Sequence, residues 1–249
     1  MEVVTNAKKT YLAGKERLTV FDDLSLTVEP GATNFILGPN GCGKSTLLRI
    51  LTGAEVLDEG VVGLVLAGHD LAGVVTQNYR DPLLPWASVS DNLLIAHRSA
   101  DPLAQPFVER CLQYIRSWGY ELSARARVMS LSGGQQQAIV LARALAFEPE
   151  ILIWDEPFSA VDFARRQAMY RTVRAYCEHP DRNAFMTTHD LDQALRLADR
   201  VLVYDTGMKL TVDLRVEVSA ATRLEDSRGT GALAQLREQI LAAIASQSR

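Results

Sequence analysis

Residues 38–46 read Gly38–Pro39–Asn40–Gly41–Cys42–Gly43–Lys44–Ser45–Thr46 and match the phosphate-loop pattern G-x-x-x-x-G-K-[ST]. The glycines let successive backbone N–H groups turn towards a phosphate chain, and a helix starting near Lys44 adds its positive N-terminal end. Lys44 is suited to the β- and γ-phosphates of a nucleotide, and the Ser45 hydroxyl to Mg²⁺. The alternative is a chance glycine-rich turn, which is disfavoured because a strand pattern precedes the loop and a helix pattern follows it. We therefore predict that these nine residues bind nucleotide phosphates.

The segments around this loop alternate between strand and helix patterns. Short apolar runs predict strands, and a helical pattern at Leu191–Ala198 separates the last two of them. This order favours an α/β domain with a largely parallel sheet. The predicted strands are Asn34–Leu37, Ile151–Trp154, Phe185–Thr188 and Val201–Tyr204.

The stretch from about Val89 to Phe147 has helical periodicity and little strand pattern, with breaks near Pro102, Pro106 and Ser130. It predicts a helical subdomain inserted into the α/β core. Near the end of the chain, apolar residues again recur at helical spacing and predict a short amphipathic helix, which could dock on the body or on a partner. These residues are Leu233, Leu236, Ile240 and Ile244.

Composition narrows the class of protein. The chain has 249 residues, 47% of them apolar, and 26 basic against 30 acidic residues give a net charge of −4. This balance gives no support to a nucleic-acid partner, although it does not exclude a local basic patch. The apolar run Val61–Gly68 is far shorter than the roughly 20 residues of a membrane span, and the first residues lack a signal-peptide pattern. The cysteines form no CxxC pair, which favours reduced thiols in a cytosolic protein.

A pair of carboxylates follows the predicted strand Ile151–Trp154. Asp155 and Glu156 come at its C-terminal end, the edge at which ligands of open α/β sheets bind. Asp155 is suited to hold Mg²⁺, directly or through water, and Glu156 to act as general base for an attacking water. Taken alone, the two carboxylates could be solvated surface; beside a phosphate loop, a catalytic role is favoured.

The stretch Leu131–Ser132–Gly133–Gly134–Gln135–Gln136–Gln137 predicts a helix start. Ser132 as N-cap and Gln135 three residues later form a capping box. Small glycines beside an exposed helix N-terminus also make an anion site. A plain helix cap and an anion site are both compatible with these residues.

In this order, the motifs resemble those of the ATP-binding subunit of ABC transporters, from about Val4 to Val218. The resemblance implies a P-loop NTPase core of the RecA-like type with a mainly parallel sheet, a small antiparallel β-subdomain and an inserted helical subdomain at about 83–150. Residues 1–218 would form the nucleotide-binding domain and 219–249 a C-terminal tail. The matching motifs are Gly38–Ser45 (Walker A), Gln77 (Q-loop), Leu131–Gln135 (LSGGQ signature), Leu152–Glu156 (Walker B), Ser159–Asp162 (D-loop), His189 (switch histidine) and Tyr11 (the aromatic that stacks on adenine).

The resemblance also implies roles for these residues. ATP and Mg²⁺ would be the cofactors, with Ser45, Gln77 and Asp155 around the metal. Glu156, His189 and Gln77 would be catalytic: His189 would hold the γ-phosphate, and Gln77 would contact the attacking water and report the nucleotide state to a membrane subunit. Ser132, Gly133 and Gly134 would bind the γ-phosphate of an ATP held by the opposite subunit, so that two identical or similar chains enclose two ATP molecules head to tail. Gln135 and Asp162 would also be nucleotide-binding residues.

One segment resembles the ATPases of nitrate, sulfonate and taurine importers. Leu83–Leu84–Pro85–Trp86 and Val89–Ser90–Asp91–Asn92 follow Gln77, where importers receive a helix of the membrane permease. The alternative is a packed turn with Trp86 as an apolar plug. The sequence departs from the family at Thr76, where phenylalanine is usual, at Val161, where leucine is commoner, and in the short stretch between Gly60 and Gln77, which predicts a trimmed β-subdomain.

The expected function is therefore ATP hydrolysis that powers an importer, with permease subunits near Gln77 and Trp86 and, indirectly, a periplasmic or lipid-anchored substrate-binding protein. The chain would lie peripherally at the cytoplasmic face of the plasma (inner) membrane. The alternatives are a soluble ABC ATPase or an exporter subunit; a simple P-loop kinase or GTPase would not need residues Ser132–Gln135. The resemblance implies that the transported solute is a small anion or organic solute such as nitrate, a sulfonate or taurine.

Overall fold

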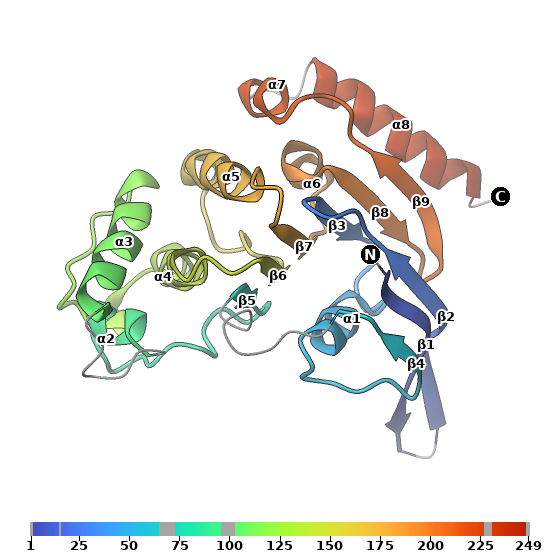
Figure 1. Ribbon diagram of the computed structural model, residues 1–249, viewed down its shortest axis with the longest axis horizontal. Coiled ribbons are helices and arrows are strands. Elements are labelled where there is room, and N and C mark those ends of the chain that lie inside the picture. Colours follow the sequence, from blue (N-terminus) through green and yellow to red (C-terminus); the bar gives the residue numbers. More distant parts are fainter. Residues whose placement is uncertain (1, 15, 65–72, 96–102, 227–230, 248–249) are drawn as a thin grey trace.

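The computed structural model describes residues 2–14, 16–64, 73–95, 103–226 and 231–247. Its centre is a six-stranded sheet in the order β5-β6-β7-β3-β8-β9 (Figure 1). The first five strands are parallel, and β9 pairs antiparallel with β8 at one edge. The strands are β3 (Thr33–Leu37), β5 (Val74–Val75), β6 (Ile151–Asp155), β7 (Asn183–Thr187), β8 (Arg200–Tyr204) and β9 (Leu210–Arg215).

The strands in the middle of this sheet are buried on both faces, as their continuous apolar sequences predict. All five residues of β3 are buried, and they alternate between two apolar clusters: Phe35 joins one cluster and Ile36 the other. The same alternation puts Ile153 of β6 and Phe185 of β7 into the cluster of Ile36. The predicted α/β fold with a mainly parallel sheet is confirmed, and the carboxyl ends of its strands meet at one edge.

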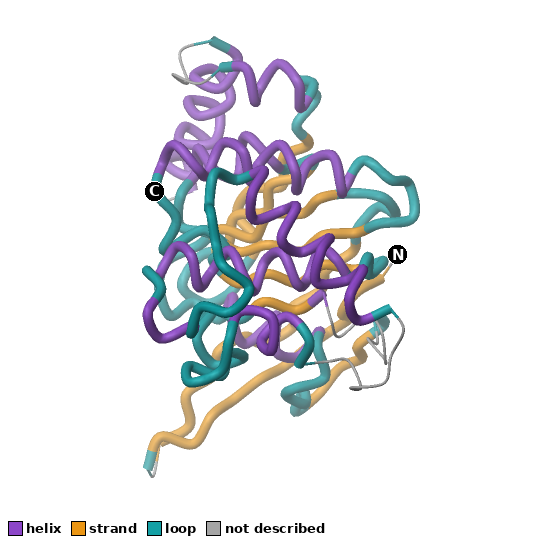
Figure 2. The backbone as a smooth tube through the Cα atoms, turned by 90° about the vertical axis from the view of Figure 1, so that its left-hand side faces the viewer, coloured by secondary structure: helices purple, strands orange, loops and turns teal. Residues whose placement is uncertain are grey.

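A second, antiparallel sheet in the order β2-β1-β4 carries the N-terminal part of the chain. It comprises β1 (Glu2–Ala13), β2 (Glu16–Thr27) and β4 (Glu59–Val62). Figure 2 shows the β1–β2 hairpin as a long arm that extends from the body. Its apolar inner face packs on α1 (Lys44–Leu51), the helix that follows the phosphate loop. The predicted β-subdomain is thus present; whether it is trimmed depends on residues 65–72, which lie outside the described residues.

A helical lobe lies beyond β5, shown in green in Figure 1. It contains α2 (Val89–Leu93), α3 (Ala104–Ser117), a 3-10 turn (Val128–Ser130) and α4 (Gly133–Ala146). Pro106 does not interrupt a helix, because it occupies the first turn of α3, where a backbone N–H has no intrahelical partner. The break predicted near Pro102 lies outside the described residues.

The remaining helices are α5 (Phe163–Cys177), α6 (Leu191–Leu197), α7 (Ala220–Glu225) and α8 (Ala232–Gln247). The last two lie beside α6 and β9 (Figure 1). Leu233, Leu236 and Ile240 are buried in the main apolar cluster, so α8 docks on the body of this chain. Arg223 of α7, which is 1% exposed, donates hydrogen bonds to the carbonyls of Leu195 and Ala198 at the end of α6. Within the described residues, no helix is both long and apolar enough to cross a membrane.

Candidate nucleotide site

The phosphate loop connects β3 to α1 at the carboxyl edge of the sheet. Gly41 and Gly43 have positive φ angles of 79° and 122°, which side-chain-bearing residues adopt rarely. A Cβ atom on Gly43 would lie 2.6 Å from a Val20 methyl group, so the loop also passes too close to β2 for any side chain there. Glycine is therefore required at position 43 for two reasons: the positive φ angle and the close approach of Val20.

The side chain of Lys44 is folded along its own loop. Its Nζ donates hydrogen bonds to the carbonyls of Gly38 (2.8 Å) and Pro39 (2.9 Å), and the residue is 7% exposed. Cys42 points the other way, into the core, where its Sγ lies 3.7 Å from the Met208 sulfur. Cys42 can therefore offer only its backbone to a ligand.

A cavity of about 290 Å³ opens at this loop, which we call the P-loop cavity. Four separate parts of the chain line it: the β1–β2 hairpin, the phosphate loop with the start of α1, the segment after β5 and the end of β6. Its lining residues are Tyr11, Leu18, Val20, Asn40, Gly41, Gly43, Lys44, Ser45, Thr46, Gln77, Asp155 and Glu156.

The two acidic residues at the end of β6 are held by β7. Thr187 donates a hydrogen bond through Oγ1 to Oδ1 of the buried Asp155. The N–H of Glu156 points at Thr187 as well, 3.2 Å from its Oγ1 and 3.3 Å from its carbonyl oxygen. Glu156 has a φ of 48°, a left-handed conformation that is uncommon outside glycine. The turn after β6 is thus fixed by the neighbouring strand.

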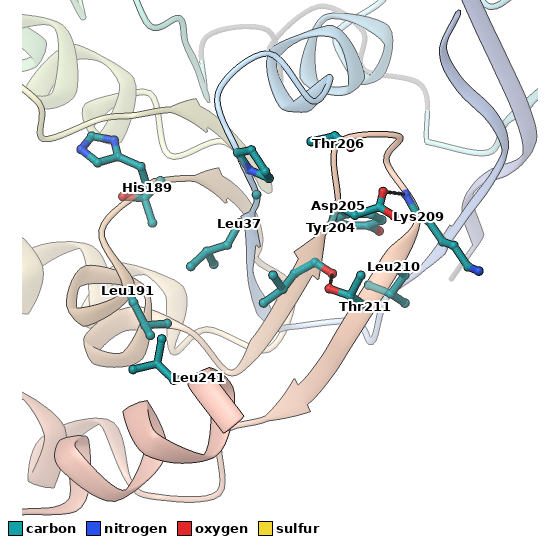
Figure 3. Close-up of a pocket in the computed structure, with 14 residues that line it drawn as sticks. Leu37, His189, Leu191, Tyr204, Asp205, Thr206, Lys209, Leu210, Thr211 and Leu241 are labelled. Atoms are coloured by element: carbon teal, nitrogen blue, oxygen red, sulfur yellow. Dashed lines mark hydrogen bonds between the residues drawn. The ribbon is translucent and has the colours of Figure 1, made fainter. Parts of the chain in front are cut away.

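Glu156 also contacts the predicted switch histidine. Its Oε1 lies 3.1 Å from Nδ1 of His189, and the Glu156 side chain is 15% exposed whereas that of His189 is 67% exposed. His189 lines a larger hollow of about 890 Å³ together with Gly38 and Pro39 (Figure 3). In Figure 3, Leu191 and Leu241 lie at the end of this hollow that α8 closes.

The oxygen groups in the P-loop cavity suit Mg²⁺. Ser45, Gln77 and Asp155 line this cavity and also an adjoining hollow of about 310 Å³. A hydroxyl, an amide carbonyl and a carboxylate are the hard oxygen ligands that Mg²⁺ prefers, and this ion usually takes one or two carboxylates together with substrate phosphates and water. Within the described residues, no group of three His, Cys, Asp or Glu side chains could hold a metal without such help.

Tyr11 stands over the start of α1. Its hydroxyl lies 3.4 Å from Oγ1 of Thr46 and 3.4 Å from Nη2 of Arg49. The Lys9 ammonium is 5.2 Å from the centre of the ring. Leu18 is the cross-strand partner of Tyr11 in the hairpin and is 60% exposed. The hairpin therefore brings an aromatic and an aliphatic side chain to the rim of the P-loop cavity.

A second cavity, of about 330 Å³, lies at the start of α4, and we call it the signature cavity. Ser132 caps α4 with a full capping box: its hydroxyl accepts from the N–H of Gln135, whose side chain accepts from the N–H of Ser132. A Cβ atom on Gly133 would lie 2.7 Å from the Tyr79 hydroxyl, and one on Gly134 would lie 2.7 Å from the Tyr120 hydroxyl. Both glycines therefore leave room for an aromatic neighbour.

Asp162 belongs to the signature cavity and does not line the P-loop cavity of its own chain. It caps α5, and its carboxylate pairs with Nη1 of Arg165 at 2.8 Å. The hydrogen bonds from Arg165 lower the pKa of Asp162, so the pair stays charged at neutral pH. Arg165 also lies over the ring of Tyr120, 4.6 Å from its centre.

The segment after Gln77 presents an exposed aromatic side chain. Trp86 is 68% exposed, so it is not the apolar plug of the alternative interpretation, whereas Leu83 is buried in the main cluster. The side chain of Asn92 holds the segment by accepting from the N–H of Leu84 and donating to its carbonyl. Arg143 of α4 donates to the carbonyls of Pro82 and Asn92, and thereby joins this segment to the helix that begins at the signature cavity.

Sequence reasoning did not single out several residues of the two cavities. Leu18 and Thr187 belong to the P-loop site, and Tyr120 and Arg165 to the signature cavity. Only Thr187 carries a signal in the sequence, a polar residue at the end of an apolar strand that neighbours β6. The other three residues are brought to the cavities by tertiary packing, which no local sequence pattern indicates.

A phosphate loop, a Walker B pair and a capped signature helix on one P-loop core define an ATP-binding cassette. The chain belongs to the ABC transporter family, whose model matches residues 21–159. It is 38% identical to an aliphatic sulfonates import ATP-binding protein of Rhodococcus jostii (90% of this chain, 86% of that protein). It is 35% identical to a taurine import ATP-binding protein of Pseudomonas aeruginosa (91% and 89%) and 34% identical to a nitrate import ATP-binding protein of Synechococcus elongatus (84% and 78%).

Among solved structures, the fold is similar to a dimeric bacterial ABC transporter cassette, with a TM-score of 0.75 and 26% identity over 88% of this chain and all of that one. The same cassette in a post-hydrolysis state, bound to ADP and phosphate, gives a TM-score of 0.74 with the same identity and coverage.

Proposed function

We propose that this chain is the ATP-hydrolysing subunit of an ABC importer for a small anion or organic solute such as nitrate, a sulfonate or taurine. The observation that carries the hydrolytic part is the P-loop cavity, in which a phosphate-binding loop faces a strand end bearing two carboxylates. The importer part rests on relatives named as import ATP-binding proteins, which favour import over a soluble ABC ATPase or an exporter subunit.

In this proposal, the backbone of residues 38–46 and Lys44 bind the phosphates of ATP, and Tyr11 stacks on its adenine. Ser45, Gln77 and Asp155 hold Mg²⁺, which neutralises charge that develops on the phosphates. Glu156 accepts the proton of the attacking water, and Gln77 contacts the same water. His189 holds the γ-phosphate, and its contact with Glu156 fixes the positions of the two side chains relative to each other.

The signature cavity serves the ATP of a second chain, identical or similar to this one. Ser132, Gly133, Gly134 and Gln135 would donate to its γ-phosphate from the start of α4, where backbone N–H groups and the helix dipole favour an anion. Asp162 would approach the facing phosphate loop. Support comes from the separation of the two cavities within one chain, since neither cavity contains the groups of the other, and from the dimeric cassette of similar fold.

The permease would dock on the groove near Gln77 and Trp86, because an exposed tryptophan on a segment tied to α4 offers an apolar anchor with a rigid connection to the signature cavity. The chain then acts peripherally at the cytoplasmic face of the plasma (inner) membrane, with a periplasmic or lipid-anchored binding protein as an indirect partner. Residues 1–218 form the nucleotide-binding domain, its helical subdomain spans about 83–150, and residues 219–249 are its tail.

Uptake tests this function directly. In a strain that lacks the gene, uptake of labelled nitrate, taurine and an alkanesulfonate is compared after complementation with the wild type or with Glu156→Gln. We expect uptake of one solute to return only with the wild type. Equal uptake with both genes would contradict the importer assignment. Unchanged uptake of all three solutes on deletion would contradict the proposed solutes.

A further inference from the structure

We propose that Thr187 is a positioning residue for hydrolysis, whose one hydroxyl fixes the carboxylate of Asp155 and the backbone of Glu156 together. The inference rests on the proposed function, because it assigns the two acidic residues their roles in metal binding and proton transfer. It concerns a side chain that lies on the neighbouring strand, outside the motifs of the nucleotide site.

The sheet register brings the three groups together. β6 and β7 run in parallel, and their last residues, Asp155 and Thr187, are direct partners. Ile153 and Phe185, two residues earlier on each strand, belong to the apolar cluster that packs on α1. Because side chains alternate along a strand, Asp155 and Thr187 lie on this same face, the one that carries the phosphate loop.

The hydroxyl of Thr187 acts as donor and acceptor at once. It donates to Oδ1 of Asp155 and accepts from the N–H of Glu156 at 3.2 Å. Thr187 is 0% exposed and Asp155 is 8% exposed, so water competes little for either bond. One polar atom in an otherwise apolar position therefore links the first carboxylate to the peptide that precedes the second.

Each of these bonds has a consequence for catalysis. The bond to Asp155 restricts rotation of the carboxylate, so that it meets a metal ion in one orientation. The bond from Glu156 N–H helps to hold that residue at its φ of 48°, a conformation that persists only where surrounding groups fix it. Because its backbone is fixed, the Glu156 side chain extends towards His189 in a defined direction.

The competing explanation is that Thr187 only fills space. Valine has the same shape, so it would then replace threonine without effect on the site. A positioning role makes a different prediction. Loss of the hydroxyl should weaken the Mg²⁺-dependent steps selectively, because the Thr187 hydroxyl is hydrogen-bonded to Asp155 and Glu156, whereas metal-free nucleotide would be bound by the phosphate loop and Tyr11.

The test compares Thr187→Val and Thr187→Ser with the wild type, and uses Thr33→Val as a matched control. Thr33 is also a buried threonine, 1% exposed. It is the first residue of β3, so it lies at the amino end of the strand, away from the carboxyl ends that carry Asp155 and Thr187. Binding of mant-ATP is titrated with EDTA and with Mg²⁺, the Mg²⁺ concentration for half-maximal binding is determined, and phosphate release is measured. Thermal unfolding checks that each variant is folded.

For Thr187→Val we expect a rise of about tenfold or more in the half-saturating Mg²⁺ concentration and a similar loss of phosphate release, the size typical of a lost partner of a metal ligand. Binding in EDTA stays as in the wild type. Thr187→Ser, which keeps the hydroxyl, recovers most of the loss, and Thr33→Val changes neither value. If Thr187→Val does not fold, Thr187→Ala and Thr187→Ser provide the same comparison at smaller volume.

A Thr187→Val protein with wild-type Mg²⁺ dependence and phosphate release would overturn the inference, as would equal loss in the serine variant. Failure of the proposed function is a separate result, because the wild-type chain itself would then show neither Mg²⁺-dependent mant-ATP binding nor phosphate release.

Discussion

The P-loop cavity and the signature cavity are built in different ways. Strand ends of the parallel sheet, a glycine loop and a hairpin of the second sheet meet at the P-loop cavity, which contains Lys44, Asp155 and Glu156. The signature cavity lies between the starts of α4 and α5, each capped by its own side chain, Ser132 or Asp162. In the proposed function, the first cavity supplies the phosphate loop and the groups for hydrolysis, and the second supplies a helix start that binds an anion.

In the proposed function, neither cavity is a complete ATP site within one chain. Catalytic groups must lie on rigid elements in a fixed relation to the phosphates, and the sheet edge supplies this. An anion-binding helix start can be carried on a separate lobe, which is then free to meet a phosphate of another chain. The comparison predicts that damage to the P-loop cavity affects nucleotide binding or chemistry within one chain, whereas damage to the signature cavity affects only the assembled pair.

The largest effect is expected from Glu156→Gln. The amide cannot accept a proton, so phosphate release should fall by about 10²- to 10⁴-fold while ATP binding is retained. Steady-state phosphate release and a nucleotide titration measure the two quantities. Glu150→Gln is the matched control, because Glu150 is exposed and precedes the other end of β6. Turnover near that of the wild type would show that Glu156 is not the base.

Lys44→Ala tests nucleotide binding in the P-loop cavity. Loss of the ammonium leaves phosphate charge unmatched and should weaken ATP binding by about 2–5 kcal/mol. Isothermal titration with ATP gives this free energy. Lys209→Ala, which changes an exposed lysine at the rim of the larger hollow, should leave the affinity unchanged. Unchanged affinity in Lys44→Ala would contradict the assignment of the phosphate site.

Ser132→Asp separates the two cavities. Aspartate caps a helix as well as serine does, so α4 should remain intact, but its charge would face the phosphate of a second chain. We expect phosphate release to fall by about tenfold or more, since like charges in contact cost several kcal/mol. ATP binding by the single chain should not change. Ser219→Asp, at the cap of α7, is the control for the cap exchange, and equal loss in both variants would show that the signature cavity is not involved.

Tyr11→Ala should have the smallest effect. Loss of stacking on the base weakens ATP binding by about 1–3 kcal/mol, and Tyr11→Phe should retain most of the affinity because the ring remains. Binding of inorganic tripolyphosphate, which has no base, should be the same in all three proteins. A tripolyphosphate affinity that falls with that for ATP would mean that Tyr11 acts through Thr46 and Arg49 on the phosphate loop instead.

Much of the fold followed from local patterns. The strand before Gly38, the helix after it and the capping box at Ser132 are each set by residues close in sequence, so they could be predicted. Pro106 is a position at which the local pattern gave a wrong prediction. A proline predicts a break in a helix, but in the first turn of a helix it removes no hydrogen bond.

The set of residues that lines each cavity was harder to predict from the sequence, because it depends on contacts between segments that are distant in the chain. Asp155 and Thr187 are partners only through the register of β6 and β7, and the sequence alone does not state that register. Arg165 and Tyr120 meet across the signature cavity for the same reason. The exposure of Trp86 depends on how Asn92 and Arg143 hold the segment around it.

We propose that the two cavities are halves of one ATP site, which two chains share. Sedimentation velocity of Glu156→Gln, alone and combined with Ser132→Asp, tests it most directly in the presence of Mg²⁺ and ATP. We predict a dimer for the single variant, and a monomer that still binds ATP for the double variant. A double variant that dimerises with ATP as readily as Glu156→Gln would contradict the claim.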